Sequence, residues 1–242
     1  MLSDFTLKRI QSALAHGKMV PLALEHYPSR GQTAIQRLYQ TKIGKLFWKR
    51  VSERNHRECQ IPVKSGSLAE REWWAYRVAK ALGLENPPLV LLGRMTTVQL
   101  WLDLPDAHHF ITDQGPLALD LDNVFECACF DWLTGQIDRH DANYLYDFVQ
   151  RRIILIDSAH GFLRYDGSLP HYLQLFEIAC RTALHKKPKS DMVQRIAQLQ
   201  QRLPELVPLR DGGEQEALQR RLQQMRTVAT LQDVFALYRK SQ

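Results

Sequence analysis

The spacing of apolar residues predicts strands in the first half of the chain and helices in the second. Alternating or β-branched apolar runs at residues 33–39, 45–51, 89–92 and 98–102 are typical of strands. Helical spacing is present at about residues 3–18, 68–82 and 119–134, and again from about residue 171. The helix at 68–82 begins with a capping box, Ser67-x-x-Glu70, and stops at Gly83. We therefore expect an α+β protein with a small β-rich N-terminal lobe containing one helix and a larger, mostly helical C-terminal lobe.

The order of these elements predicts three segments. Residues 1–28 are expected to form an N-terminal helical extension, residues 29–104 the β-rich lobe, and residues 105–242 the helical lobe with its C-terminal helices. The lobes are expected to join near Leu102 to Pro105, where a loop begins. A chain of 242 residues is long enough for two lobes around a shared cleft.

The composition, with 45% hydrophobic and 24% charged residues, is typical of a globular protein. No apolar run approaches the roughly 20 residues that span a bilayer, and Asp4 and Lys8 interrupt the N-terminus, so no signal-peptide core is expected. Cys127 and Cys129 are two apart in a predicted helix and point to different faces, which indicates neither a zinc site nor a disulfide framework. We expect a cytoplasmic protein, while export into a host or another cell stays open.

The net charge of +6 and the pI near 9.2 favour an anionic partner. Nucleotides, phospholipid head groups, acidic proteins and nucleic acids all meet this condition, although the sequence has no clear nucleic-acid-binding motif. A weak association with an anionic membrane stays open. Each basic cluster taken alone, such as the one at residues 186–189, is equally typical of a solvated surface.

Three polar side chains, Asp138, Asn143 and Asp157, flank the most informative stretch of the chain. The apolar runs 144–146 and 152–157 are typical of strands, and the polar residues between them predict a hairpin. With a turn centred near Gln150, Asn143 and Asp157 face each other across the ladder, about 4.5–5.5 Å apart. An amide oxygen and a carboxylate at that separation can share a Mg²⁺ ion, which prefers oxygen ligands and leaves room for phosphate. Asp138 is then available to accept a hydroxyl proton, which is the layout of a kinase active site.

A second pair of residues supports this interpretation. Glu72 falls in the apolar stripe of the helix at 68–82, where an unpaired charge is costly, and the strand before it supplies Lys49 as a cation. A strand lysine held by a helix glutamate orients an ammonium group toward nucleotide phosphates in kinases. The alternative is that Glu72 faces solvent. Lys64 competes with Lys49 for the phosphate-binding role, but Pro62 beside it favours a loop.

Other polar residues near the hairpin are open to more than one interpretation. His140 could contact phosphate or brace the loop, and Asp141 could pair with Arg139. The turn at residues 29–33 could cover phosphates, but its single glycine also fits an ordinary β-turn. The absence of G-x-G-x-x-G and of G-x-x-x-x-G-K-[ST] leaves dinucleotide-binding and P-loop folds without support. The D-x-x-x-x-N spacing itself also occurs by chance, with Asp and Asn serving turns.

With these residues in place, the chain resembles the phosphatidylinositol 3- and 4-kinase-like superfamily, an atypical branch of the protein-kinase-like fold. Three segments carry the resemblance: a D-R-H-x-x-N loop, an I-D-x-x-H segment and an E-x-x-A-Y-x-x-x-x-L-G-L-x-x-P-P helix. They are Asp138-Arg139-His140-x-x-Asn143, Ile156-Asp157-Ser158-Ala159-His160, and the run from Glu72 to Leu84 with Pro87-Pro88. The helix signature is similar to that of type II phosphatidylinositol 4-kinases, toxin kinases of the HipA type and secretory-pathway kinases. The match covers roughly residues 29–165.

The resemblance implies an ATP-dependent phosphotransferase, with Mg²⁺ or Mn²⁺ as the metal, that acts on a hydroxyl acceptor. It implies these roles: Asp138 as base with His140 nearby, Asn143 and Asp157 as metal ligands, Lys49 and Glu72 as the phosphate pair, and Leu100 to Leu102 as the adenine-binding connector. The stretch after Phe162 lacks the dense basic motif that reads phosphorylated inositol, so a protein Ser or Thr is favoured over a phosphoinositide lipid. Two alternatives remain, AMP transfer on the same fold and a nucleotide-binding pseudokinase that serves as an interaction module.

Overall fold

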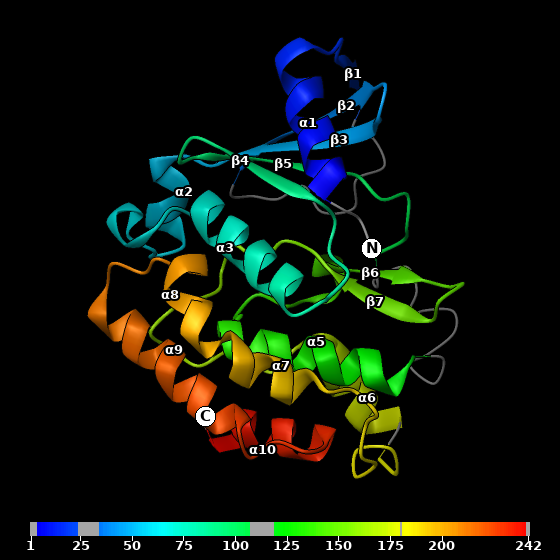
Figure 1. The fold of residues 1–242 in the computed structure, drawn as a ribbon, viewed down its shortest axis with the longest axis vertical. Coiled ribbons are helices and arrows are strands. Elements are labelled where there is room, and N and C mark those ends of the chain that lie inside the picture. The colour runs from blue at the N-terminus through cyan, green and yellow to red at the C-terminus, as the bar shows by residue number, and fades with distance from the viewer. Residues whose placement is uncertain (1–3, 24–33, 107–118, 180, 241–242) are drawn as a thin grey trace.

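The computed structural model describes residues 4–23, 34–106, 119–179 and 181–240. Their elements form a β-rich N-terminal part and a mostly helical C-terminal part, drawn one above the other in Figure 1. This arrangement confirms the predicted α+β class and the order of the two parts along the chain. Within the described residues, no helix combines the length and the apolarity that crossing a bilayer requires.

The N-terminal part is built on an antiparallel sheet of five strands in the order β1-β2-β3-β5-β4. The strands are β1 (Val20–Leu22), β2 (Ile35–Thr41), β3 (Gly44–Arg50), β4 (Leu89–Leu92) and β5 (Thr96–Leu100). Side chains alternate between the two faces of a strand, so Leu46 of β3 packs in a small core with Ile10 of α1 (Asp4–His16). Lys49 lies on the opposite face of β3 and is also buried. Lys49 therefore lies on the face of the sheet that α1 does not cover.

The C-terminal part contains a hairpin and a group of helices that pack around one central helix. Its elements are α5 (Leu121–Thr134), β6 (Tyr144–Asp147), β7 (Arg152–Leu155), α6 (His171–Ala179), α7 (Met192–Leu199), α8 (Leu203–Leu206), α9 (Gly212–Met225) and α10 (Leu231–Lys240). The central helix is α5, whose Phe130 and Trp132 are completely buried. Each side chain of this kind contributes about 1.5–3 kcal/mol on burial, so α5 provides a rigid base for the loop that follows it.

Helix α3 (Leu68–Ala81) connects the two parts of the chain. It packs against β4 and β5 of the sheet, and its Trp74 and Val78 belong to the core of the helical part. The predicted capping box is confirmed, because the Ser67 hydroxyl accepts from the amide of Glu70 at 3.0 Å and the Glu70 carboxylate accepts from the amide of Ser67 at 2.8 Å. The helix ends where Gly83 adopts φ +73°, as the glycine stop predicted.

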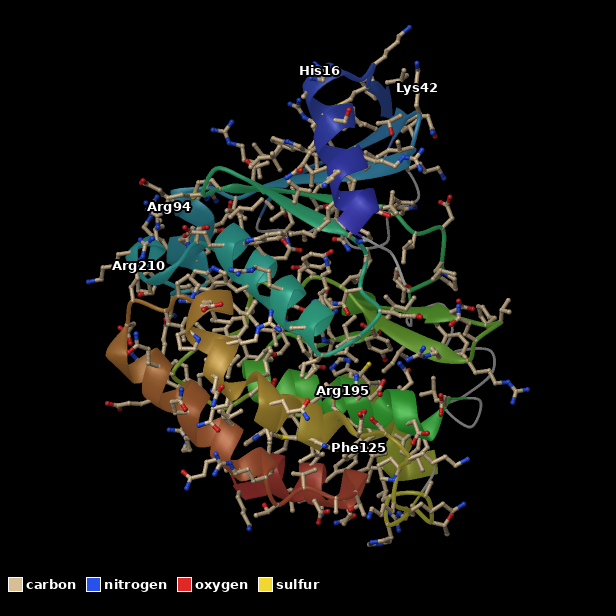
Figure 2. The ribbon with its side chains drawn as sticks, in the orientation of Figure 1. His16, Lys42, Arg94, Phe125, Arg195 and Arg210 are labelled. Carbon is tan, nitrogen blue, oxygen red and sulfur yellow. The ribbon has the colours of Figure 1, made fainter. Side chains whose placement is uncertain are left out.

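Charged side chains hold both ends of α3. Figure 2 shows Arg94 and Arg210 at the side of the molecule where α3 begins. Burial opposes the charge of Glu70, but its hydrogen bonds with Arg94 and Ser67 outweigh burial, and with the charge of Arg210 they leave the pKa of Glu70 below its usual value. At the other end, Arg195 of α7 donates to the carbonyl of Leu82. The orientation of α3 is thus fixed against both parts of the chain.

Some elements differ from the sequence-based expectation. Helix α2 (Glu53–Glu58) and a 3₁₀ turn (Val63–Ser65) lie between the strand expected at 45–51 and the helix expected at 68–82, a stretch in which no helix was predicted. A second capping box, between Ser52 and Asn55, explains why this short helix forms. Strand β1 was not predicted, and β5 begins two residues earlier than expected. The predicted turn at 29–33 and Cys180 lie outside the described residues, whereas Cys127 and Cys129 are buried in α5.

The hairpin β6–β7 forms as predicted, but its register is shifted by one residue. Tyr144 pairs with Leu155 and Asp147 with Arg152, so the turn is centred between Val149 and Gln150. The amide of Ile156 accordingly donates to the carbonyl of Asn143 at 3.1 Å. The prediction that Asn143 and Asp157 stand directly opposite each other is therefore wrong, because Asp157 lies one residue beyond the partner of Asn143.

Candidate active site

The ammonium group of Lys49 lies between two carboxylates that come from different parts of the chain. Its Nζ is 2.5 Å from Oδ1 of Asp157, which follows β7. The same Nζ is 3.7 Å from Oε2 of Glu72 on α3. The side chains of Lys49 and Glu72 are each only 7% exposed. The predicted pairing of Lys49 with Glu72 is confirmed, and the alternative in which Glu72 faces solvent is wrong.

Glu72 is held by the sheet as well as by the ammonium group. Thr97 of β5 is the register partner of Lys49, and its hydroxyl donates to Oε2 of Glu72 at 3.0 Å. Burial raises the pKa of Glu72 above its ordinary value, and the charge of Lys49 offsets only part of this effect. The carboxylate therefore depends on Lys49 to remain ionised in its apolar surroundings.

Asp157 is in a different environment, because its side chain remains 38% exposed. Burial opposes its charge, but the hydrogen-bonded ammonium of Lys49 outweighs burial and lowers the pKa of Asp157 below its ordinary value. Its backbone is left-handed, with φ +47°, a conformation that is uncommon for residues other than glycine, although Asp adopts it more readily than most. Strain of this kind is concentrated at functional sites in proteins. Asp157 is thus an ionised, partly exposed carboxylate held in an unfavourable conformation.

The loop before β6 presents Asp138 and Asn143. The Asn143 amide donates from Nδ2 to the carbonyl of Asp138 at 2.7 Å, which fixes the orientation of the amide. The amide oxygen accepts no hydrogen bond from the residues that the structure describes, so it is available as an acceptor. The carboxylate of Asp138 is 43% exposed, and its Oδ2 is 2.9 Å from Nδ1 of His160. This separation places the imidazole of His160 directly beside the carboxylate. Asp138 is therefore an accessible carboxylate whose orientation is set by a histidine.

His140 braces this loop. Its Nδ1 accepts from the amide of Ala142 at 3.2 Å, at the start of a 3₁₀ turn (Asp141–Asn143). Its Nε2 is 4.0 Å from Asp138, and its Nδ1 is 3.7 Å from Asp141. The suggested pairing of Asp141 with Arg139 is wrong, because the guanidinium of Arg139 pairs with Asp131 instead.

Arg139 is completely buried and joins the loop to β7 and to α5. It donates to both carboxylate oxygens of Asp131 on α5, at 3.0–3.2 Å. It also donates to the carbonyl of Asn143 at 2.6 Å, to the carbonyl of Ile156, and to the Ser158 hydroxyl at 2.8 Å. One side chain therefore fixes the residues that flank Asp157 relative to the loop that carries Asp138.

Sequence analysis did not identify Asp131 as part of this arrangement. Asp131 is 0% exposed, and its Oδ2 also accepts from the Tyr172 hydroxyl of α6 at 2.7 Å. A signal was present, because Asp131 lies between Phe130 and Trp132 in a run of residues, 127–133, that is otherwise apolar. The argument that assigned a cation to Glu72 would have assigned one to Asp131 as well.

The segment that follows Asp157 is held by buried arginines at successive points. Besides Arg139, two completely buried side chains take part, Arg71 of α3 and Arg221 of α9. Arg71 donates to the carbonyls of Gly161 and Phe162 at 3.0 and 3.1 Å, and Arg221 donates to those of Leu163 and Tyr165 at 3.2 and 3.0 Å. We refer to residues 156–165 as the arginine-anchored segment.

The structure does not bring every candidate residue to Lys49. Lys64 lies in the 3₁₀ turn before α3 and is exposed, and it forms no ion pair with any residue that the structure describes. Leu100 ends β5, and both Leu100 and Leu102 are half-buried. The chain after them leads to β6, where the amide of Tyr146 donates to the carbonyl of Pro105 at 3.0 Å. Leu100 thus lies at the end of the sheet, and Leu102 lies in the segment that follows it.

The side-chain oxygen atoms of Asp157 and Asn143 fit a divalent metal only in part. Asp157 Oδ2 and Asn143 Oδ1 form no hydrogen bond within the described residues and are the hard oxygen atoms that Mg²⁺ prefers. Among the residues that the structure describes, no group of three His, Cys, Asp or Glu side chains could hold a metal by itself. A metal here would need further oxygen atoms from water or phosphate, which is usual for Mg²⁺.

A small cavity adjoins Glu72 and Asp157. Its volume is about 20 Å³, enough for a water molecule but too small for a nucleotide. It is lined by side chains of α3, β4, β5 and the end of the hairpin, including Tyr76, Asn86, Leu89 and Gln99. This cavity is therefore not a nucleotide site.

No protein-family model matches the sequence, and no curated protein matches it at the sequence level. Among solved structures, the chain is similar to the Helicobacter pylori proinflammatory kinase CtkA, at 9% sequence identity over 93% of this chain and 97% of that one, with a TM-score of 0.45. It is also similar to the Rio2 kinase from Chaetomium thermophilum, solved as an ADP/Mg²⁺-phosphoaspartate complex. The Rio2 match has 14% identity over 99% of this chain and 76% of that one, with a TM-score of 0.45.

Proposed function

We propose that this protein is an ATP- and Mg²⁺-dependent phosphotransferase that acts on a hydroxyl acceptor. The observation that carries the proposal is the position of the Lys49 ammonium, 2.5 Å from Asp157 and 3.7 Å from Glu72. A strand lysine beside a helix glutamate and a metal-binding aspartate is the arrangement with which kinases orient and neutralise phosphates. The sequence resemblance to phosphatidylinositol 3- and 4-kinase-like enzymes supports the same reaction, and we propose membership of that superfamily on its motifs.

Each candidate residue has a role under this proposal. ATP supplies the phosphoryl group, and the Mg²⁺ bound to it supplies the positive charge that neutralises the phosphates. Asn143 and Asp157 offer oxygen atoms to the metal, and Lys49, held by Glu72, contacts phosphate. Asp138 orients the acceptor hydroxyl and takes its proton, since its carboxylate is the most exposed of the group.

The remaining assignments follow the same scheme. Leu100 and Leu102 contact the adenine, and His140 braces the loop that carries Asp138. The proposed lobes are residues 29–104 and 105–242, with a helical extension at 1–28. Protein Ser or Thr is the favoured acceptor over a phosphoinositide lipid, and the cytoplasm is the favoured location, with weak binding to an anionic membrane left open.

The direct test is ATP turnover by the Asp157→Ala variant. We expect wild-type activity to require Mg²⁺ and the variant to lose about 100-fold or more, because the substitution removes one of two metal-binding oxygen groups. The matched control is Asp191→Ala, which removes an exposed carboxylate whose ion-pair partner among the described residues is Arg195. Unfolding curves must show that Asp157→Ala is folded. Full activity in that variant would reject the assignment.

A second comparison decides between the two candidate lysines. We expect Lys49→Met to abolish turnover and Lys64→Met to leave it within about twofold of wild type, because Lys49 is buried beside both carboxylates whereas Lys64 is exposed. The reverse result would transfer the phosphate-binding role to Lys64. Kinetic constants for ATP, measured with each variant, supply the comparison.

Two further measurements separate phosphate transfer from the alternatives. ATP labelled at the α-phosphate or the γ-phosphate shows whether AMP or phosphate is transferred. Calorimetry with Mg-ATP tests the pseudokinase alternative, which predicts no turnover in spite of nucleotide binding. Acceptor classes are compared by incubating the enzyme with phosphoinositide vesicles in one reaction and with a cell lysate in another.

A further inference from the structure

Arg71 precedes Glu72 on α3, and its guanidinium is completely buried. It donates to carbonyls on both sides of the helix. Nε contacts the carbonyl of Gly66 at 3.1 Å, while Nη1 contacts those of Gly161 and Phe162 at 3.0 and 3.1 Å. Arg71 therefore links α3 directly to the arginine-anchored segment.

The counter-charge of Arg71 comes from a distant helix. Glu214, in the first turn of α9, is 4% exposed, and its Oε1 is 2.7 Å from Nη2 of Arg71. The other oxygen of Glu214, Oε2, has no hydrogen-bond partner in the part of the chain that the structure describes. A buried ion pair with an unsatisfied oxygen is a poor source of stability, because apolar side chains of the same volume usually stabilise a protein as well or better. This pair therefore calls for a role other than stability.

The atoms that Arg71 holds lie next to the candidate base. Gly161 and Phe162 directly follow His160, whose ring fixes Asp138. Phe162 has φ +61°, a conformation that costs about 1–2 kcal/mol without compensation. Its amide donates to the carbonyl of Thr134 at 2.5 Å, and Arg71 holds its carbonyl from the other side. The backbone after His160 is thus kept in a strained form by α5 on one side and α3 on the other.

We propose that Glu214 is a positioning residue for the candidate active site. By neutralising Arg71 it keeps the guanidinium on the carbonyls of Gly161 and Phe162, and so keeps Nδ1 of His160 2.9 Å from the carboxylate of Asp138. The inference rests on the proposed function, in which Asp138 is the base. It gives α9, which lies outside the sequence motifs, a defined part in the reaction.

The variant that tests this inference is Glu214→Gln, which keeps the shape and removes the charge. We expect kcat to fall about tenfold or more, since small misplacements of a catalytic group are costly. The KM for ATP should stay within about twofold, because Arg71 has no contact with Lys49 or Asp157. Glu216→Gln is the matched control, an exposed glutamate of the same helix, and it should match wild type.

Nuclear magnetic resonance of the histidine rings reports on the placement of His160 beside Asp138 without requiring any turnover. Because Nδ1 of His160 lies 2.9 Å from Oδ2 of Asp138, a proton on Nδ1 should exchange slowly with water, and its signal is assigned by its loss in His160→Gln. We expect Glu214→Gln to weaken or abolish that signal and Glu216→Gln to retain it. A wild-type signal in Glu214→Gln would overturn the inference. If the wild-type protein turns over no ATP, the proposed function fails, and this signal alone decides whether Glu214 positions His160.

A double variant separates positioning from stability. Arg71→Met combined with Glu214→Leu removes both charges together, so its unfolding midpoint should recover relative to Glu214→Gln. The contacts of Arg71 with Gly161 and Phe162 are lost, so kcat and the His160 signal should remain low. Recovery of kcat or of the signal in the double variant would show that the pair is merely structural.

Discussion

Replacing Asp131 with asparagine is expected to destabilise the protein, because it leaves the Arg139 guanidinium buried without its counter-charge. Both side chains of the pair are 0% exposed, so neither charge can turn to water in the folded state. Asparagine keeps the shape of the site and one acceptor oxygen, so the change acts mainly on charge. Removing one partner of a buried pair typically costs about 3–5 kcal/mol.

The size of this effect can be compared with that of a neighbouring change. Tyr172→Phe removes the 2.7 Å hydrogen bond to Oδ2 of Asp131 but leaves the Asp131–Arg139 pair intact. Loss of one hydrogen bond to a charged acceptor costs about 1.5–3 kcal/mol. Against a total stability of about 5–15 kcal/mol for a protein of ordinary size, both variants should still fold, and Asp131→Asn should be the less stable of the two.

Urea unfolding followed by circular dichroism measures both effects on the same scale. The free energy of unfolding should decrease in the order wild type, Tyr172→Phe, Asp131→Asn, with little change in the slope against urea. If Asp131→Asn costs less than about 1 kcal/mol, the pair has no counter-charge role and this reasoning fails. ATP turnover by the folded variants then shows whether Arg139 also aligns Asp138 with Asp157.

Two other expectations concern local structure. Gly66 has φ +119°, and a Cβ there would lie 2.3 Å from Cη2 of Trp74, so Gly66→Ala should lower the free energy of unfolding by at least about 2 kcal/mol. Gly93 has φ +62°, and an added Cβ there would meet no described atom within 4 Å, so Gly93→Ala should cost only about 1 kcal/mol. Equal losses of stability in the two alanine variants would contradict the steric argument. Burial lowers the pKa of His56, whose Nε2 accepts from the amide of Leu68. The stability that the neutral ring of His56 contributes should thus be complete above about pH 6.5. It should be lost as the pH falls through the lower folded-state pKa of His56. Between pH 7.5 and 5.5, wild type should therefore lose more stability in urea than His56→Gln, and identical losses would reject this role.

The parts of the fold that depend on local chemistry were predictable from the sequence. Ser67 and Glu70 cap their own helix, and Gly83 ends it, so the boundaries of α3 follow from residues within it. The burial of Glu72 followed from helical spacing, and Lys49 was the cation available on the preceding strand.

Features that depend on turn geometry or on distant packing were not predictable in this way. The hairpin register depends on Asp147, whose carboxylate accepts from two turn amides, and on the left-handed Arg151, and neither is apparent from polarity alone. The pairing of Asp131 with Arg139, and that of Arg71 with Glu214, depends on helices that meet only in the folded chain. The sequence showed that such charges need partners, but the fold selects them.

The arginine-anchored segment has a consequence for how this molecule comes apart. Moving residues 156–165 away would take hydrogen-bond acceptors from three buried guanidinium groups, those of Arg71, Arg139 and Arg221. Each lost hydrogen bond to a charged group costs about 1.5–3 kcal/mol. A partial opening of that stretch would therefore be nearly as unfavourable as melting the entire protein. Local fluctuation and global denaturation become a single cooperative event at this point of the chain, so the candidate base and metal-binding carboxylates are expected to keep their arrangement until the whole structure is lost.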